Sequence, residues 1–168
     1  MIALFDFEDS FTFNIFSEIK SSPAFAGTKV DILPWYSMDL ESLLSYEVVI
    51  FGPGPGHPQE YSSILPEFKQ WLALKNALPQ AFMGICLGHQ LLWWALGENV
   101  ESAHIPLHGH SETLNLPAWE IFEDGLHGKK VEVQRYNSLV VKSPAQTAQF
   151  AGDEGDLKQG LGVRNCEQ

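Results

Sequence analysis

The first hundred residues alternate short apolar runs with amphipathic stretches, and this alternation limits the fold more than any other feature of the sequence. The apolar runs have the length and composition of buried strands, and the amphipathic stretches carry apolar residues at helical spacing. Strands that alternate with helices imply a mostly parallel sheet with helices on both faces. The strand candidates are 2–6, 29–33, 47–52 and 81–85, and the helix candidates are 10–21, 61–75 and 88–97.

After residue 100 the pattern changes to short runs in which apolar and polar residues alternate. A period of two is typical of strands with one exposed face, so we expect antiparallel strands added to or beside the parallel core. The chain is therefore predicted to be an α/β protein with a mostly parallel central sheet, flanking helices and a smaller antiparallel portion in its second half. The runs are 103–109, 111–116, 118–122, 129–136, 138–141, 148–152 and 160–165.

The composition excludes several classes of protein. With 168 residues, 45% of them apolar and 18% charged, the chain fits one globular domain spanning 1–168. A formal net charge of −11 argues against nucleic acid or an anionic membrane as a partner, because both attract a basic face. No apolar stretch approaches the ~18 to 20 residues of a membrane helix, and the N-terminus lacks the basic region of a signal peptide. Cys86 and Cys166 are the two cysteines, and their spacing is not that of a disulfide-stabilised scaffold. We therefore expect a cytoplasmic protein with reduced thiols.

Cys86 stands in the sequence GICLGHQ (84–90), where a predicted strand ends and a predicted helix begins. Flanking glycines permit the sharp turn of a nucleophile elbow, which presents the side chain at the carboxyl edge of the sheet. There the helix N-terminus is expected to lower the pKa of the thiol, and the backbone N–H of Leu87 to point at a developing oxyanion. The alternative is a small buried residue at the end of a strand, because free cysteines are commonly buried.

Two further segments have both a structural and a functional interpretation. FGPGPGHP (51–58) is no phosphate-binding loop, because it lacks a Lys-Ser/Thr ending and Pro55 removes an amide donor. It is either a stiff proline-rich turn or a loop that supplies a second oxyanion N–H. RYNSLVV (135–141) contains Ser138 and Leu139, and by itself it predicts only a turn before a strand.

Taken together, these segments resemble the class I (triad) glutamine amidotransferases, and more narrowly the small glutaminase subunit of anthranilate synthase and aminodeoxychorismate synthase. The resemblance runs in family order from residue 2 to about residue 165, and it implies the flavodoxin-like fold of that family. The matching segments are FDFEDSFTFN (5–14), GPGPGHP (52–58), GICLGHQ (84–90), LHGHSETL (107–114), RYNSLVV (135–141) and GLGVRN (160–165).

The resemblance implies that Cys86 attacks the side-chain amide of L-glutamine, forms a glutamyl thioester and releases ammonia. Gly54 and Leu87 would supply the oxyanion N–H groups. In the family the ammonia passes to a larger synthase subunit that aminates chorismate, and neither a metal nor an organic cofactor is implied for the glutaminase subunit. The residues that would hold glutamine are Gly54, Pro55, Gly56, Gln90, Ser138 and Leu139.

The sequence departs from the family at the catalytic base. The family has a histidine and a glutamate in a His-Pro-Glu-Ser motif near the C-terminus, and this motif is absent here. We therefore expect a domain that lacks its C-terminal strand and helix, with Gln168 about one strand short of the place where the motif would begin. Position 137, which is commonly histidine in the family, is asparagine. The six histidines are at positions 57, 89, 104, 108, 110 and 127.

Among these histidines, His57 is the best internal candidate for a base, because its loop is expected to face the thiol. His89 should diverge from Cys86 at the start of a helix and cap or pack instead, and His108 and His110 are expected at the surface. Two alternatives to an active glutaminase therefore stay open. One is a catalytically impaired or non-catalytic relative that binds a partner, glutamine or both, because the His-Pro-Glu motif is absent, and the other is an unrelated cysteine hydrolase that uses His57.

Overall fold

The computed structural model describes residues 1–74, 81–115 and 129–142, and these residues form two compact units. The first unit spans Met1–Glu98 and the second begins at Asn99. The second unit contains the strands β5 (Asn99–Asn115) and β6 (Lys130–Lys142). The elements of the first unit are β1 (Ile2–Asp6), α1 (Thr12–Ser21), η1 (Pro23–Phe25), β2 (Val30–Pro34), η2 (Trp35–Ser37), α2 (Leu40–Leu43), β3 (Val48–Phe51), η3 (Pro58–Ile64), α3 (Leu65–Leu74), β4 (Ala81–Gly84) and α4 (Leu87–Ala95), where η marks a 3₁₀ helix.

The strands of the first unit form a parallel sheet in the order β2-β1-β3-β4. In the register of this sheet, Ile2 of β1 is aligned with Val30 of β2 and with Val48 of β3. The order is that of the flavodoxin-like doubly wound fold, in which the direction of winding reverses between β1 and β3. The predicted α/β class is confirmed, and each apolar run forms a strand within one residue of its expected bounds.

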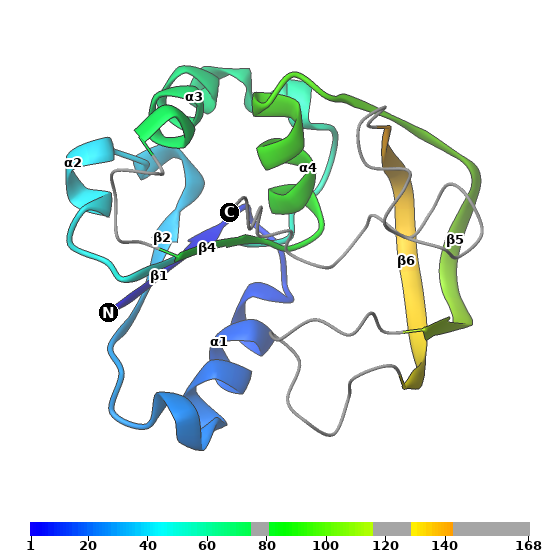
Figure 1. The fold of residues 1–168 in the computed structure, drawn as a ribbon, viewed down its shortest axis with the longest axis horizontal. Coiled ribbons are helices and arrows are strands. Elements are labelled where there is room, and N and C mark those ends of the chain that lie inside the picture. The colour runs from blue at the N-terminus through cyan, green and yellow to red at the C-terminus, as the bar shows by residue number, and fades with distance from the viewer. Residues whose placement is uncertain (75–80, 116–128, 143–168) are drawn as a thin grey trace. The chain divides into compact units, whose positions relative to one another are not determined.

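Helices cover both faces of this sheet, as the alternation of elements predicts (Figure 1). On one face, Ile2, Leu4 and Ile50 pack against Ile15 and Ile19 of α1. On the other face, the strands pack against α3 and α4. Successive residues of one strand therefore enter two apolar clusters, which explains why the strands are apolar throughout. The second cluster includes Phe5, Phe51, Phe68, Trp71, Leu87 and Leu91, each at most 2% exposed.

The helices lie where the amphipathic stretches predict them, with one difference. The stretch 61–75 starts as the 3₁₀ helix η3 and becomes α-helical only at Leu65. Pro58 begins this segment, and Tyr61 interrupts the helical geometry with φ −101° and ψ 22°. Within the ranges that the structure describes, no helix has the length and apolar character that crossing a membrane requires.

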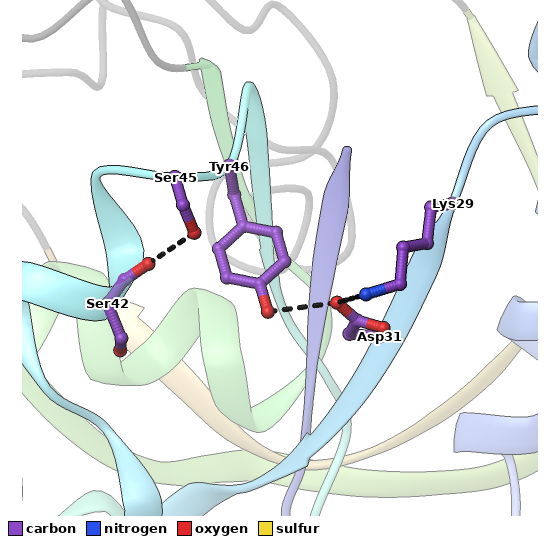
Figure 2. A network of polar contacts seen from close by, with 5 residues as sticks. All are labelled: Lys29, Asp31, Ser42, Ser45 and Tyr46. Carbon is purple, nitrogen blue, oxygen red and sulfur yellow. Dashed lines mark hydrogen bonds and ion pairs between the residues drawn. The ribbon is translucent and has the colours of Figure 1, made fainter.

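A polar network joins β2 to the segment before β3 at the amino ends of the strands (Figure 2). The Tyr46 hydroxyl donates to Oδ2 of Asp31 at 3.0 Å, and Nζ of Lys29 donates to the same oxygen at 2.9 Å. The hydrogen bond from Lys29 holds the pKa of Asp31 below its ordinary value. Just after α2, the Ser45 hydroxyl donates to the carbonyl oxygen of Ser42 at 2.7 Å. The network lies at the end of the sheet opposite to the loops that follow β1, β3 and β4.

The second unit is an antiparallel ribbon of β5 and β6, so the predicted antiparallel portion is confirmed. Each of these strands is longer than expected, because it joins two neighbouring runs that were expected to be separate strands. The register shifts between Ser102 and Leu107 and again between His108 and His110, where Gly109 has φ +68°. Such bulges interrupt the alternation of a strand without ending it. The runs 118–122, 148–152 and 160–165 lie outside the described residues.

Two glycines allow α4 to approach the sheet closely. A Cβ on Gly88 would collide with the carbonyl oxygen of Phe51, and a Cβ on Gly84 would lie 2.5 Å from the backbone nitrogen of His89. The N–H of Gly88 also donates to the carbonyl oxygen of Gly52 at 3.1 Å. The first turn of α4 therefore rests directly on the backbone at the end of β3.

Gly88→Ala should lower the free energy of unfolding by about 3 kcal/mol, because the atoms it would meet are backbone atoms that cannot rotate away. Gly97→Ala is the control. A Cβ there meets nothing within 4 Å, so only the strain at φ +95° remains, about 1 kcal/mol. Denaturant unfolding measures both variants. Equal losses would contradict the close packing of α4.

Candidate active site

Cys86 occupies the sharp turn between β4 and α4, with φ 52° and ψ −110°. β4 ends at Gly84 and α4 begins at Leu87, so the predicted strand–turn–helix geometry of GICLGHQ is confirmed. The thiol is partly buried, and the backbone N–H of Leu87 hydrogen bonds to it. The side chain stands at the carboxyl edge of the parallel sheet, where open α/β sheets place their sites.

The thiol is less acidic than the sequence predicts. Burial raises the pKa of Cys86 above its ordinary value, the N–H of Leu87 opposes this rise, and the negative charge of Asp9 adds to it. The predicted lowering of the pKa by the first backbone N–H of α4 is present, but the net shift is upward, because the desolvation of a thiolate outweighs the effect of one backbone donor. The resting side chain is a neutral thiol at neutral pH, and it needs a base to become a nucleophile.

The loop after β3 places Gly54 beside the residue that follows Cys86. A Cβ on Gly54 would lie 2.5 Å from Cδ2 of Leu87 and 2.5 Å from Cβ of Phe7, so only glycine fits at this position. Pro55 and Gly56 continue the loop on its exposed side. The structure thus brings together Gly54 and Leu87, the two residues that the resemblance assigns to the oxyanion hole.

The turn after β1 ends at the same edge of the sheet. Oδ1 of Asp6 accepts the N–H groups of Glu8 and Asp9, at 3.0 and 3.3 Å. The same oxygen accepts the Thr12 hydroxyl at 2.8 Å, and Oδ1 of Asp9 accepts the N–H of Phe11 at 2.8 Å. These bonds fix the Asp9 carboxylate close enough to Cys86 to affect its pKa. Sequence reasoning assigned no role to Asp9, although it lies three residues after a predicted strand, in the segment FDFEDSFTFN that resembles the family.

His89 lies in the core and packs there, as expected. It is 2% exposed, and its Nε2 accepts a hydrogen bond from Nε1 of Trp93 at 2.8 Å. Because Nε2 is an acceptor, the proton of the neutral ring is on Nδ1, which has no hydrogen-bond partner among the described residues. Burial lowers the pKa of His89 to about 4. The ring is therefore neutral at pH 7, and its accepting nitrogen already serves Trp93.

His57 caps the helix η3. Its Nδ1 accepts the N–H of Gln59 at 3.2 Å, and its own N–H donates to Oε1 of Glu60 at 2.7 Å. This reciprocal arrangement is a capping box. A role for His57 as a base stays a prediction, and one ring nitrogen of His57 is an acceptor for the helix.

The other residues predicted to bind glutamine are divided between the two units. Gln90 lies in the first turn of α4, is 5% exposed, and donates its backbone N–H to the carbonyl oxygen of Cys86 at 3.1 Å. Ser138 and Leu139 lie within β6, so RYNSLVV is part of a strand and not a turn before one. The Ser138 hydroxyl and Nε2 of His108 are 2.8 Å apart across the ribbon. Gln90 thus shares a unit with the nucleophile elbow, whereas Ser138 and Leu139 belong to the second unit.

Ion pairing also joins RYNSLVV to the opposite strand. Nη1 of Arg135 donates to Oε2 of Glu112 at 2.9 Å, and Nε of Arg135 donates to Oδ1 of Asn137 at 3.1 Å. This ion pair therefore links LHGHSETL and RYNSLVV, the two segments of the ribbon that resemble the family, across the strands. Neither in this ribbon nor in the described part of the first unit do three or more His, Cys, Asp or Glu side chains form a group that could hold a metal ion.

The sequence matches known proteins along most of its length. Residues 3–165 match the family model for glutamine amidotransferase class-I, and the chain belongs to this family. It is 34% identical over 166 residues to the pyocyanine-specific anthranilate synthase component 2 of Pseudomonas aeruginosa, which covers 98% of this chain and 80% of the relative. It is also 37% identical over 154 residues to a Schizosaccharomyces pombe protein provisionally named an aminodeoxychorismate synthase. That match covers 89% of this chain but spans only 20% of the relative.

A solved structure shares the fold. The crystal structure of a glutamine amidotransferase from Thermotoga maritima superposes with a TM-score of 0.59 and 19% sequence identity, covering 95% of this chain and 68% of that one. At this level of identity the likeness concerns the fold alone. The predicted fold of a class I amidotransferase is confirmed.

Alkylation of Cys86 by iodoacetamide should have its midpoint at a pH above that of an exposed cysteine, because only the thiolate reacts and burial disfavours it. Asp9→Asn should lower this midpoint, because the substitution removes the charge that raises the pKa of the thiol and keeps an oxygen to accept the N–H of Phe11. Asp39→Asn is the control, since Asp39 caps α2 by accepting the N–H of Ser42. Mass spectrometry of the Cys86 peptide across a pH series gives each midpoint. An unchanged midpoint for Asp9→Asn would show that Asp9 does not act on the thiol.

The free energy of unfolding should fall between about pH 6.5 and pH 4, because unfolded His89 binds a proton in this range and folded His89 does not. The contribution of the neutral, buried His89 ring to the free energy of unfolding is fully present above pH 6.5, and about 3 kcal/mol of it is lost at pH 4. His89→Gln keeps an acceptor for Trp93 but cannot titrate, so its stability should depend less on pH. His104→Gln, which replaces an exposed histidine, should behave like the wild type. Denaturant unfolding at stepped pH tests this, and a wild-type slope in His89→Gln would refute it.

Proposed function

We propose that the chain is the glutaminase component of a chorismate-using synthase, which releases ammonia from L-glutamine through Cys86. The observation that carries this proposal is that Cys86 stands at a sharp turn, that the N–H of Leu87 hydrogen bonds to its thiol, and that Gly54 packs against Leu87. A nucleophile beside backbone donors is what acyl transfer from an amide requires. Membership of the glutamine amidotransferase class-I family supports glutamine as that amide.

In the proposed reaction the thiol of Cys86 gives its proton to a base, and the sulfur attacks the side-chain carbonyl carbon of glutamine. The carbonyl oxygen becomes an oxyanion, which the N–H groups of Gly54 and Leu87 stabilise. The C–N bond then breaks, ammonia leaves with the proton from the base, and a glutamyl thioester remains. Water hydrolyses the thioester, which yields glutamate and restores the thiol. Because burial keeps the thiol neutral, the reaction depends on the first proton transfer.

The proposed partner is a larger chorismate-binding subunit that consumes the ammonia and forms anthranilate or aminodeoxychorismate. The names of the relatives support both products. Because the chain spans 20% of the Schizosaccharomyces pombe relative, we assign the amination of chorismate to the partner. The glutaminase component itself uses no metal or organic cofactor in this scheme. The residues proposed to hold glutamine are Gly54, Pro55, Gly56, Gln90, Ser138 and Leu139.

A second candidate function is the binding of glutamine without turnover. It is favoured by the hydrogen bonds of the two histidines in the described part of the first unit. His89 accepts the indole N–H of Trp93, and His57 accepts the N–H of Gln59. Each histidine thus uses one ring nitrogen for a group other than the thiol of Cys86. In this case a glutamine-like electrophile would label Cys86, but little ammonia would form.

Ammonia release from L-glutamine, measured with and without a chorismate-using synthase subunit, tests the proposal. The wild type should release ammonia, and Cys86→Ala should lower the rate by about 10³-fold or more. Cys166→Ser replaces the other cysteine and should keep the wild-type rate. Labelling of Cys86 by a chloroketone analogue of glutamine without ammonia release would favour the binding function. The absence of both labelling and release would refute both functions.

A further inference from the structure

Tyr61 is buried beside the loop that contains Gly54. It is 8% exposed, and its hydroxyl donates to the carbonyl oxygen of Pro55 at 3.0 Å. Burial raises the pKa of Tyr61, so the hydroxyl stays protonated and remains a donor at neutral pH. The hydrogen bond fixes the rigid peptide plane after Pro55, and the proline ring fixes the φ angle before it. Little freedom therefore remains between this anchored carbonyl and Gly54.

The ring of Tyr61 supports Gly54 from a second direction, through Phe7. The ring centroids of Tyr61 and Phe7 are 5.3 Å apart in an edge-to-face arrangement, and Trp35 lies 5.0 Å from Tyr61 by the same measure. Cβ of Phe7 in turn lies 2.5 Å from the place where a Cβ on Gly54 would stand. A continuous row of contacts thus runs from Tyr61 through Phe7 to Gly54, which contacts Leu87.

The far end of the loop is held by the residue before Tyr61. Oε1 of Glu60 accepts the N–H of His57 at 2.7 Å, and a Cβ on Gly56 would collide with the same carboxylate. The helix η3 therefore fixes the loop at Pro55, at Gly56 and at His57. Gly54 lies between this fixed segment and the end of β3.

We propose that Tyr61 is a positioning residue for the oxyanion hole, which holds Gly54 beside Leu87 through its hydrogen bond to Pro55 and its ring contact with Phe7. This inference rests on the proposed glutaminase function. An oxyanion donor must lie within about 2.7 to 3.1 Å of the oxygen that becomes charged. A small shift of Gly54 would weaken binding of the transition state much more than binding of the neutral amide, so kcat should change more than KM.

The test compares Tyr61→Phe with Tyr46→Phe. Both variants lose one tyrosine hydroxyl that donates at 3.0 Å. The Tyr46 hydroxyl bonds to Asp31 (Figure 2) near the amino ends of the strands, whereas Cys86 follows the carboxyl end of β4. Both keep their aromatic ring, and thermal unfolding checks that each variant folds. Ammonia release from glutamine gives kcat and KM. Labelling of Cys86 by a chloroketone analogue of glutamine gives a second rate. The thiol loses its proton to solvent, the sulfur adds to the ketone carbonyl and forms an oxyanion in the same hole, and the sulfur then displaces chloride from the neighbouring carbon while the carbonyl re-forms. Chloride needs no proton to leave.

Tyr61→Phe should lower kcat and the labelling rate by about 5- to 20-fold with KM within about 2-fold, and Tyr46→Phe should leave all three within about 2-fold. If Cys86 of the wild type is labelled but no ammonia is released, the labelling rates alone test the inference. Wild-type rates in Tyr61→Phe, or equal losses in both variants, would overturn the inference and leave the glutaminase function standing. A wild type that neither labels at Cys86 nor exceeds Cys86→Ala in ammonia release would overturn the proposed function and the inference with it.

Discussion

The first turn of α4 lies directly on the backbone at the end of β3, and the arrangement of the site depends on this contact. Gly88 donates to the carbonyl oxygen of Gly52 and leaves no room for a side chain against Phe51. The contact determines where α4 begins, and it thereby presents the N–H of Leu87 to the preceding thiol. It also turns His89 into the core, where Trp93 occupies its acceptor nitrogen. One backbone contact thus places the nucleophile and directs the histidine nearest to it in sequence into the core.

The architecture could be predicted from the sequence because its signals are local. Apolar runs of strand length between amphipathic stretches leave few arrangements other than a covered parallel sheet, and two glycines around Cys86 predict a tight turn. The length of β5 was harder to predict for a local reason as well. At the bulge around Gly109 the alternation of apolar and polar residues slips, so one strand looks like two separate runs.

The chemistry of the site was less predictable because it depends on residues that only folding brings together. The effect of a helix N-terminus on Cys86 can be deduced from the sequence, but burial depends on the residues that cover the thiol, and burial dominates. His57 looked suited to proton transfer from its position in a loop, yet its ring accepts the N–H of Gln59 in a capping box. Tyr61 and Asp9 also reach the site only through packing. Tyr61 lies in none of the matching segments, and the segment that contains Asp9 does not by itself assign this residue a role.

Glu8 and Cys86 are the non-glycine residues with positive φ in the described part of the chain, and both lie in turns at the carboxyl ends of strands. Such backbone angles cost a residue with a side chain about 1 to 3 kcal/mol, whereas glycine adopts them freely. A glycine at position 86 would therefore relax the turn and remove the thiol in a single change. Stability therefore favours glycine at position 86, whereas reactivity requires the cysteine.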